Sequence, residues 1–197
     1  MLPASPLVDN LPGVWDTDFN RKWERLYVFM RKKVVALVLS MLLMLSGAFA
    51  LAELPTPKEV SVDISFEGDI YPLEDFGLQM LLPMGWSYVE DDDVLFAMQN
   101  EETNQMMAAF LVPAEDHASA EDLMADVDEI DEMTGEYVTI NGLPFVLYEY
   151  ATQDLAGAFL ITEEGEPMLH IVFGPASDAE FAGLRMQILS SIQPVSE

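Results

Sequence analysis

The sequence contains no cysteine and is poor in cations. Among its 197 residues are eight Lys or Arg and two His, against 35 Asp and Glu. A chain without thiols forms no disulfide, no thiolate metal site and no cysteine nucleophile, and it has no cysteine to carry a lipid anchor. A domain of this size buries enough apolar surface to fold without covalent staples. The absence of cysteine is therefore compatible with export, although disulfides are common in exported proteins.

One apolar run stands apart from the rest of the chain. Residues 34–50 carry no charge, and Arg31, Lys32 and Lys33 stand directly before them. The run ends in two small-x-small sites, 48–50 and 50–52, which together with the basic start are the parts of a secretory signal. It is also short for a membrane span, which needs about 20 residues. We therefore expect residues 30–52 to be a cleaved signal peptide and the protein to be secreted; the alternative is an uncleaved signal that anchors it in the membrane.

The first 29 residues do not fit in front of such a signal. They contain three prolines and show no helical or strand period. Met30 stands where an initiator is expected, immediately before the basic cluster. Our hypothesis is that residues 1–29 are an upstream extension of the reading frame, or a disordered tail if the signal stays uncleaved. Residues 53–197 then form a single acidic domain.

The charge of that domain limits its partners. Residues 1–52 hold six of the eight Lys and Arg but four of the 35 acidic residues, so residues 53–197 keep Lys58 and Arg185 against 31 acidic groups. Nucleic acids and anionic membranes are bound through Lys and Arg, so both are excluded as partners. Cations are attracted instead: calcium, basic peptides or cationic components of a cell envelope. The competing interpretation is a solvated shell that keeps a secreted protein soluble.

The apolar pattern of residues 53–197 is mainly that of β-strands. Asn141-Gly142, between two apolar runs, is a strong signal for a tight hairpin, because both residues tolerate a positive φ. The continuously apolar run 106–112 is typical of a central strand covered on both faces. The expected strands are 60–66, 78–82, 86–89, 94–98, 106–112, 137–140, 145–148, 158–161 and 168–173.

Two helices are expected among these strands. Ser119 is placed to cap the first, with Leu123, Val127 and Ile130 on one face and Gly135 as its stop. Ser177 and Glu180 form a capping box for the second. Its buried stripe comprises Phe181, Leu184, Ile188, Leu189 and Ile192. Helices packed on a mainly antiparallel sheet give an α+β sandwich.

The segment 76–86, Phe-Gly-Leu-Gln-Met-Leu-Leu-Pro-Met-Gly-Trp, resembles the opening of the PsbP-like family, in which a strand runs into Pro-x-Gly-Trp. The Asn141-Gly142 hairpin and the terminal helix 181–192 are similar to later elements of that family. The resemblance implies a PsbP-like sandwich and an exported binding or assembly module without a shared catalytic centre. It carries over no functional residue, and it makes Trp86 a core anchor. Many bacterial relatives are lipoproteins, and this chain lacks the cysteine for such tethering.

Catalytic groups are scarce in residues 53–197. The imidazole bases there are His117, in a polar connection where we expect it exposed, and His170, in the middle of a strand where we expect it packed. No Gly-x-Ser-x-Gly, His-Glu-x-x-His or Gly-rich phosphate loop is present. The many acidic residues leave a carboxylate-dependent extracellular hydrolase as an alternative.

Calcium binding is the second alternative. The run Glu90-Asp91-Asp92-Asp93 falls at a turn, where clustered carboxylates suit a hard cation. The run 126–131 lacks the glycine of an EF-hand loop and is typical of a helix. The favoured hypothesis is a secreted non-enzymatic binding or assembly module of unknown partner. It assigns no catalytic, cofactor-binding or metal-binding residue and requires no cofactor.

Overall fold

A computed structural model describes residues 56–89 and 94–195. No helix in these two ranges is long and apolar enough to cross a membrane. The helices and strands, in chain order, are β1 (Lys58–Val60), β2 (Gly68–Leu73), β3 (Leu78–Pro83), β4 (Ser87–Val89), β5 (Phe96–Asn100), β6 (Gln105–Val112), α2 (Ala120–Glu129), β7 (Met133–Ile140), β8 (Leu143–Tyr150), β9 (Leu155–Leu160), β10 (Met168–Gly174), α3 (Ala179–Ser190) and β11 (Gln193–Pro194).

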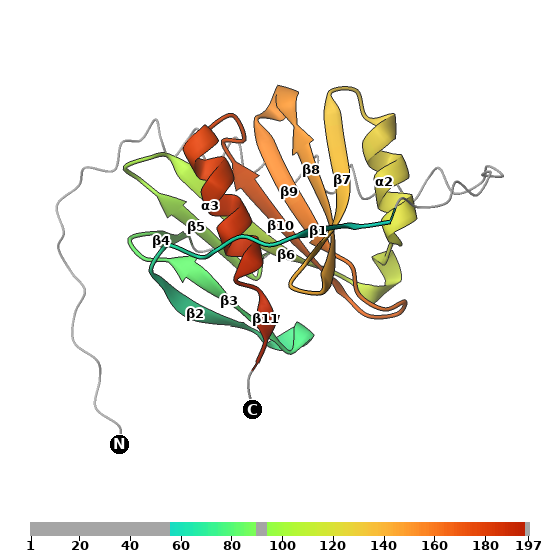
Figure 1. Ribbon diagram of the computed structural model, residues 1–197, viewed down its shortest axis with the longest axis horizontal. Helices are drawn as coiled ribbons and strands as arrows, with labels where there is room; N and C mark the ends of the chain where they lie inside the picture. The colour runs from blue at the N-terminus through green and yellow to red at the C-terminus, as the bar shows by residue number, and fades with distance from the viewer. Residues whose placement is uncertain (1–55, 90–93, 196–197) are drawn as a thin grey trace, which may run out of the picture. The chain divides into compact units, whose positions relative to one another are not determined.

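Two sheets organise these elements (Figure 1). The larger has the strand order β1-β7-β8-β9-β10-β6-β5-β4, and the smaller has the order β11-β3-β2. All pairings in both sheets are antiparallel except that of β1 with β7. The fold is therefore α+β with a mainly antiparallel sheet, as predicted, and β6 is an interior strand of that sheet.

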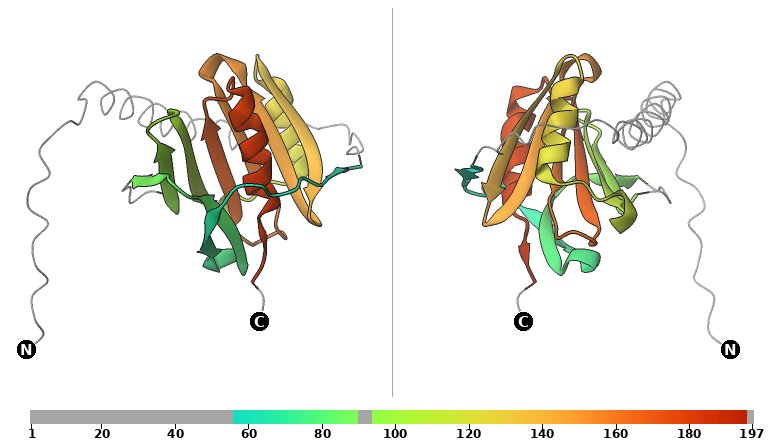
Figure 2. Two further views of the ribbon diagram at one scale, coloured as in Figure 1. Left: turned by 60° about the vertical axis from the view of Figure 1, so that its left-hand side comes forward. Right: turned by 90° about the vertical axis from the view of Figure 1, so that its right-hand side faces the viewer.

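Helix α3 lies on one face of the larger sheet and α2 on the other (Figure 2). The main core joins α3 to both sheets, since Phe181 and Ile188 are clustered with Met80 and Leu82 of the smaller sheet and with Phe173 of the larger. Trp86 belongs to the same core, 9% exposed with its ring centroid 5.7 Å from that of Phe181, so the prediction of a core anchor is confirmed. A second cluster forms between α2 and the opposite face of the sheet.

The hairpin between β7 and β8 is confirmed. Asn141 and Gly142 have φ values of 52° and 79°, the left-handed values that a two-residue turn of type I′ requires. Side chains alternate across each strand, so Phe145 and Leu147 face α3 whereas Val146 and Tyr148 face α2. The turn therefore sets the register that places each residue of β8 on its face of the sheet.

The first expected helix begins as predicted but ends sooner. Ser119 caps α2, its side chain accepting from the Asp122 N–H while the Asp122 carboxylate accepts from the Ser119 N–H. The helix ends at Glu129, and Gly135 lies inside β7, so the prediction of Gly135 as a stop is wrong. A Cβ at Gly135 would press on the side chain of Val127. The glycine thus lets α2 approach the sheet closely.

The second helix has a different cap from the one predicted. The N-cap of α3 is Asp178, whose carboxylate accepts from the N–H groups of Glu180 and Phe181. Ser177 lies outside the helix, and its N–H and hydroxyl donate to the carboxylate of Asp154. The carboxylate one residue further on is the better acceptor for the free N–H groups of the first turn, because it carries a charge.

The strand expected over 60–66 is mostly absent from the described fold. β1 ends at Val60, and residues 61–67 cross α3 without joining either sheet (Figure 1). The Ser65 N–H and hydroxyl both donate to the side-chain oxygen of Gln187 on α3. The two ends of the predicted strand, Val60 and Phe66, pack against the core, whereas Ile64 between them is 42% exposed. A helix below this segment offers side chains and no backbone ladder, so an extended strap forms in place of a strand.

Candidate functional site: a groove between the sheet and α3

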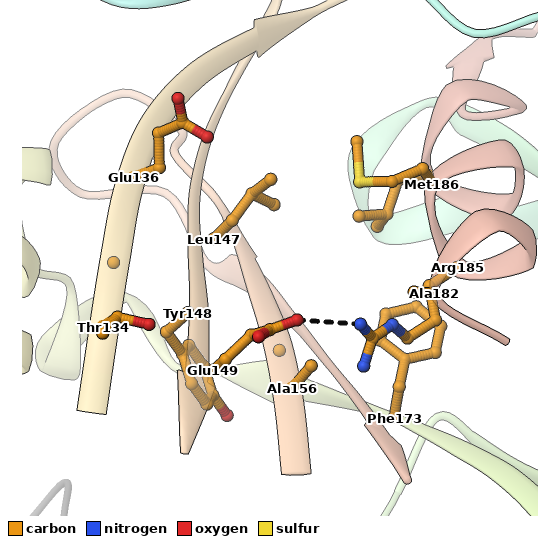
Figure 3. Close-up of a pocket in the computed structure, with 13 residues that line it drawn as sticks. Thr134, Glu136, Leu147, Tyr148, Glu149, Ala156, Phe173, Ala182, Arg185 and Met186 are labelled. Carbon is orange, nitrogen blue, oxygen red and sulfur yellow. Dashed lines mark hydrogen bonds and ion pairs between the residues drawn. The ribbon is translucent and has the colours of Figure 1, made fainter. Parts of the chain in front are cut away.

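A groove with a volume of about 580 Å³ lies between α3 and strands β7 to β10 (Figure 3). Its floor follows the register of the sheet: Thr134 pairs with Glu149, Glu149 with Ala156, and Ala156 with Phe173. Glu136 and Leu147, another pair, form the neighbouring row. The floor thus combines apolar side chains with two carboxylates.

The groove is hollow because β9 is built from small residues. The segment Ala156-Gly157-Ala158 crosses the sheet below α3, and its alanines point toward the helix. Between Glu149 on β8 and Phe173 on β10, the floor therefore drops to a single methyl group at Ala156. This row of small side chains leaves the space that larger residues fill elsewhere in the core.

The wall of the groove is one face of α3. Ala182, Arg185, Met186 and Leu189 line it, at the spacing of three and four residues that aligns side chains along a helix. Figure 3 shows the side chains of Arg185 and Met186 turned from α3 toward β8 and β9. Three of the four are apolar. Arg185 is the exception, and it is one of two cations in residues 53–197.

Arg185 is 6% exposed, which is rare for a charged side chain. Its Nη2 donates to Glu149 Oε1 at 2.9 Å, and its guanidinium lies 5.9 Å from the ring centroid of Phe181. Its Nη1 is buried and has no hydrogen-bond partner among the described residues. A buried N–H of a charged group costs free energy when it has no acceptor. Nη1 is therefore an unsatisfied hydrogen-bond donor in the wall of the groove.

Glu149 contrasts with its partner, because its side chain is 60% exposed. Glu136, on the neighbouring strand, forms an ion pair with Lys58 at 3.0 Å, and both side chains are more than half exposed. Exposed pairs of this kind contribute little to stability and exchange readily. The groove therefore presents one buried guanidinium with two carboxylates that are open to solvent.

The two histidines singled out from the sequence lie elsewhere. His170 is 1% exposed on the α2 face of the sheet, with Nε2 2.9 Å from the Tyr148 hydroxyl and its ring stacked on Phe159. Burial lowers the pKa of His170 to about 3 and raises the pKa of Tyr148, so both groups are neutral near pH 7. The expectation that His170 is a packed residue is confirmed.

His117 differs from its prediction. It is half-buried, and its Nε2 lies 3.2 Å from the carbonyl oxygen of Thr162. The polar connection that carries it folds back on the loop after β9, which the sequence pattern does not reveal. The acidic run 90–93, the candidate calcium site, lies outside the described residues. Within 56–89 and 94–195, no three His, Asp or Glu side chains are grouped to hold a metal ion.

Arg185 is the groove residue that sequence reasoning missed. The predicted buried stripe of α3 is largely confirmed, with Phe181, Ile188 and Leu189 buried and Leu184 half-buried. Arg185 lies four residues after Phe181 and three before Ile188, the spacing of a buried face. A single Arg at a position of the helix where the spacing predicts a buried apolar residue was the signal that could have identified it.

No family model and no curated protein matches this chain. Solved structures with a similar fold include cyanobacterial PsbP (CyanoP) from Synechocystis sp. PCC 6803, at 13% identity and a TM-score of 0.46, over 64% of this chain and 92% of that one. A Bacteroides thetaiotaomicron VPI-5482 protein (16%, TM-score 0.42) covers 66% of this chain, which spans 49% of that protein. The Saccharomyces cerevisiae Ran-binding protein Mog1p (11%, TM-score 0.42) covers 67% of this chain and 97% of its own. PsbP, which the sequence resembles, is among these structures. The similarities concern the fold alone.

Proposed function

We propose that this protein is a secreted binding module without catalytic activity, and that the groove between α3 and strands β7 to β10 is its ligand site. The observation that carries the proposal is the groove's composition: about 580 Å³ of space, mostly apolar walls and one buried guanidinium whose Nη1 has no acceptor within residues 56–89 and 94–195. Small-molecule sites in proteins typically have this size and this combination of apolar lining with a few polar groups.

The residues that line the groove argue for binding over hydrolysis. Two of them carry a hydroxyl, Thr134 and Tyr148, and the Tyr148 hydroxyl lies 2.9 Å from His170 on the α2 face of the sheet. No histidine or lysine among the described lining residues could act as a base for Thr134. The two carboxylates are each held by a cation, Glu149 by Arg185 and Glu136 by Lys58. A glycosidase needs one carboxylic acid kept protonated in a dry site. Two exposed, ion-paired carboxylates are poorly suited to that task.

Ligand binding is tested by thermal unfolding of the purified protein with a panel of amino acids, short peptides, short-chain carboxylates and sugars. A ligand of the native state raises the melting temperature in a saturable way. The variant Ala156→Leu fills the floor and should abolish the shift. Ala125→Leu, on the exposed side of α2, is the matched control and should keep it. A panel without any saturable shift, or a shift that survives Ala156→Leu, contradicts the proposal.

Secretion is part of the same proposal and rests on the signal in residues 30–52. The protein recovered from culture medium should begin near Leu51 or Glu53 and lack the first 29 residues. N-terminal sequencing checks this expectation. Recovery from membranes alone, with Met1 retained, would contradict it and favour the anchored alternative.

A further inference from the structure

The starting point is the unsatisfied half of the Arg185 guanidinium. Nη2 is paired with Glu149, whereas Nη1 is buried without an acceptor among the described residues. A guanidinium presents its N–H groups as a planar fork that matches the two oxygens of a carboxylate. Nη1 of Arg185 can therefore donate hydrogen bonds to a second carboxylate, and Arg185 lines a groove that can hold one.

Glu149 is the exposed partner of this guanidinium. The side chain of Glu149 is 60% exposed, and that of Arg185 is 8% exposed. The carboxylate that covers the guanidinium is consequently a surface group that can rotate toward water, while the cation below is held by packing. Rotation of Glu149 would free Nη2 beside the unpaired Nη1, so that both terminal nitrogens are available to a ligand carboxylate without a change in the backbone.

The charge of the protein decides what kind of carboxylate can arrive. With 31 acidic groups against two basic ones in residues 53–197, a simple anion is repelled at long range. A ligand that also carries a cation avoids this repulsion. Glu136 provides the complementary group for that cation; it lies on the strand next to Glu149 and on the same face of the sheet, opposite the wall of α3. The two glutamates are diagonal neighbours, which places their Cα atoms about 7–8 Å apart.

The remaining surface of the groove is apolar. Leu147 and Phe173 belong to the floor and Met186 to the wall, and Figure 3 shows them around the space between the two charged regions. Glu136 lies at one end of this space and Arg185 across it. A ligand that reaches both needs opposite charges separated by an apolar body.

We propose that the groove binds a short zwitterionic peptide with apolar side chains, its carboxylate on Arg185 and its ammonium on Glu136. This inference rests on the proposed function, because it uses the same groove. It goes further by naming the ligand's chemistry. The volume of about 580 Å³ lies within the range of sites for drug-sized ligands, which favours a peptide over a free amino acid.

Calorimetric titration with matched probes tests the inference. Leucyl-leucine has both charges, its C-terminal amide lacks the carboxylate, its N-acetyl form lacks the ammonium, and leucine is the free amino acid. We expect the amide and the N-acetyl form each to bind about tenfold or more weakly than leucyl-leucine, because each loses one charge-assisted contact. Leucine should also bind more weakly, since it cannot span the groove. Rising salt should weaken the cationic amide and leave the zwitterion little changed.

Two variants assign the charged ends of the ligand. Arg185→Met keeps the volume of the wall and should remove the preference for leucyl-leucine over its amide. Glu136→Gln should reduce the preference for leucyl-leucine over the N-acetyl form; an unchanged preference contradicts the placement of the ammonium on Glu136. Urea unfolding of each variant verifies that it is folded. If a variant does not fold, the comparison among the probes on the unaltered protein still tests the inference.

The outcomes separate this inference from the proposed function. If leucyl-leucine and both capped forms bind with equal affinity, and Ala156→Leu abolishes this binding, the ligand need not be a zwitterion and this inference is overturned. The groove then remains a binding site, as the proposed function states. Binding of other panel ligands but of no peptide has the same meaning. Equal affinity for leucine overturns the assignment to peptides. Failure of every probe and every panel ligand overturns the proposed function itself.

Discussion

Two adjacent residues of β8 divide the polar chemistry of this protein between two environments. Tyr148 points to the α2 face, where it meets His170 in a sealed cluster. Glu149 points to the α3 face, where it meets Arg185 at the edge of the groove. The sealed pair is neutral and the groove pair is charged. A neutral hydrogen-bonded pair can be buried completely. An ion pair has a large desolvation cost when both partners are buried, and this cost is smaller when one partner stays in water.

The largest expected effect concerns the sealed pair. The pKa of His170 is about 3 in the folded chain, against an ordinary value of 6.5. Below pH 6.5 the unfolded chain binds a proton that the native chain does not, so stability falls as the pH drops from about 6.5 toward 3. The slope approaches about 1.4 kcal/mol per pH unit. Urea unfolding between pH 4 and 8 measures it.

The double variant Tyr148→Phe/His170→Phe is the control for this slope. It replaces both partners together and so leaves neither polar group unsatisfied. The free energy of unfolding of the variant should decline less in acid than that of the unaltered protein. Parallel declines would show that His170 is not the group responsible.

The second prediction compares added volume on the two faces at neighbouring positions of β9. A Cβ at Gly157 would overlap the ring of Tyr148. Gly157→Ala should therefore lower the free energy of unfolding by about 1–3 kcal/mol. Ala156→Leu points into the groove and should change it by less than about 1 kcal/mol, because the new side chain fills open space. Equal losses in chemical denaturation would contradict the assignment of one face as sealed and the other as open.

The third prediction breaks the charged pair from each side. Glu149→Ala leaves the guanidinium of Arg185 buried without its acceptor and should cost about 1–2 kcal/mol of unfolding free energy. Arg185→Met leaves an exposed carboxylate that water solvates, so the variant should match or exceed the original stability. Thermal and urea unfolding decide between these outcomes. A larger loss for Arg185→Met would mean that the ion pair itself stabilises the fold.

The smallest expected effect lies on α2. Partial burial, with the charges of Glu129 and Asp122, raises the pKa of Asp126 to about 6. The native chain therefore binds a proton more readily than the unfolded chain, and stability falls as the pH rises from about 4 through 6. Asp126→Asn should add a few tenths of a kcal/mol above pH 6. No difference from the original protein is expected below pH 4, which is the internal control.

Prediction from the sequence succeeded where a signal is local. The Asn141-Gly142 turn and the Ser119 cap depend on residues within a few positions of one another, and both formed as expected. It failed where the partner is remote. Residues 61–67 alternate like a strand, but α3 lies below them and offers no backbone to pair with. Asp178, and not Ser177, caps α3, because the N–H and hydroxyl of Ser177 donate to Asp154.

The groove shows the same division. The small residues of β9, Ala156 and Gly157, and the lone cation on α3, Arg185, are visible in the printed sequence. The sequence does not reveal that these residues lie together, because that depends on the register of β8 with β9 and on where α3 crosses the sheet. Arg185 lies 29 positions after Ala156 and 28 after Gly157, so these residues line one site only after those pairings form.

By itself, the sequence determined the composition of the domain: a mainly antiparallel α+β fold, a surface crowded with carboxylates and no thiol chemistry. Periodicity and turn residues carry that information, because they act over a few residues. The tertiary structure alone decided which polar groups are buried. It sealed His170 between aromatic rings as a neutral base, and it placed Arg185 under an exposed carboxylate at an open groove. Burial and charge pairing depend on neighbours brought from distant segments, so no local pattern contains them.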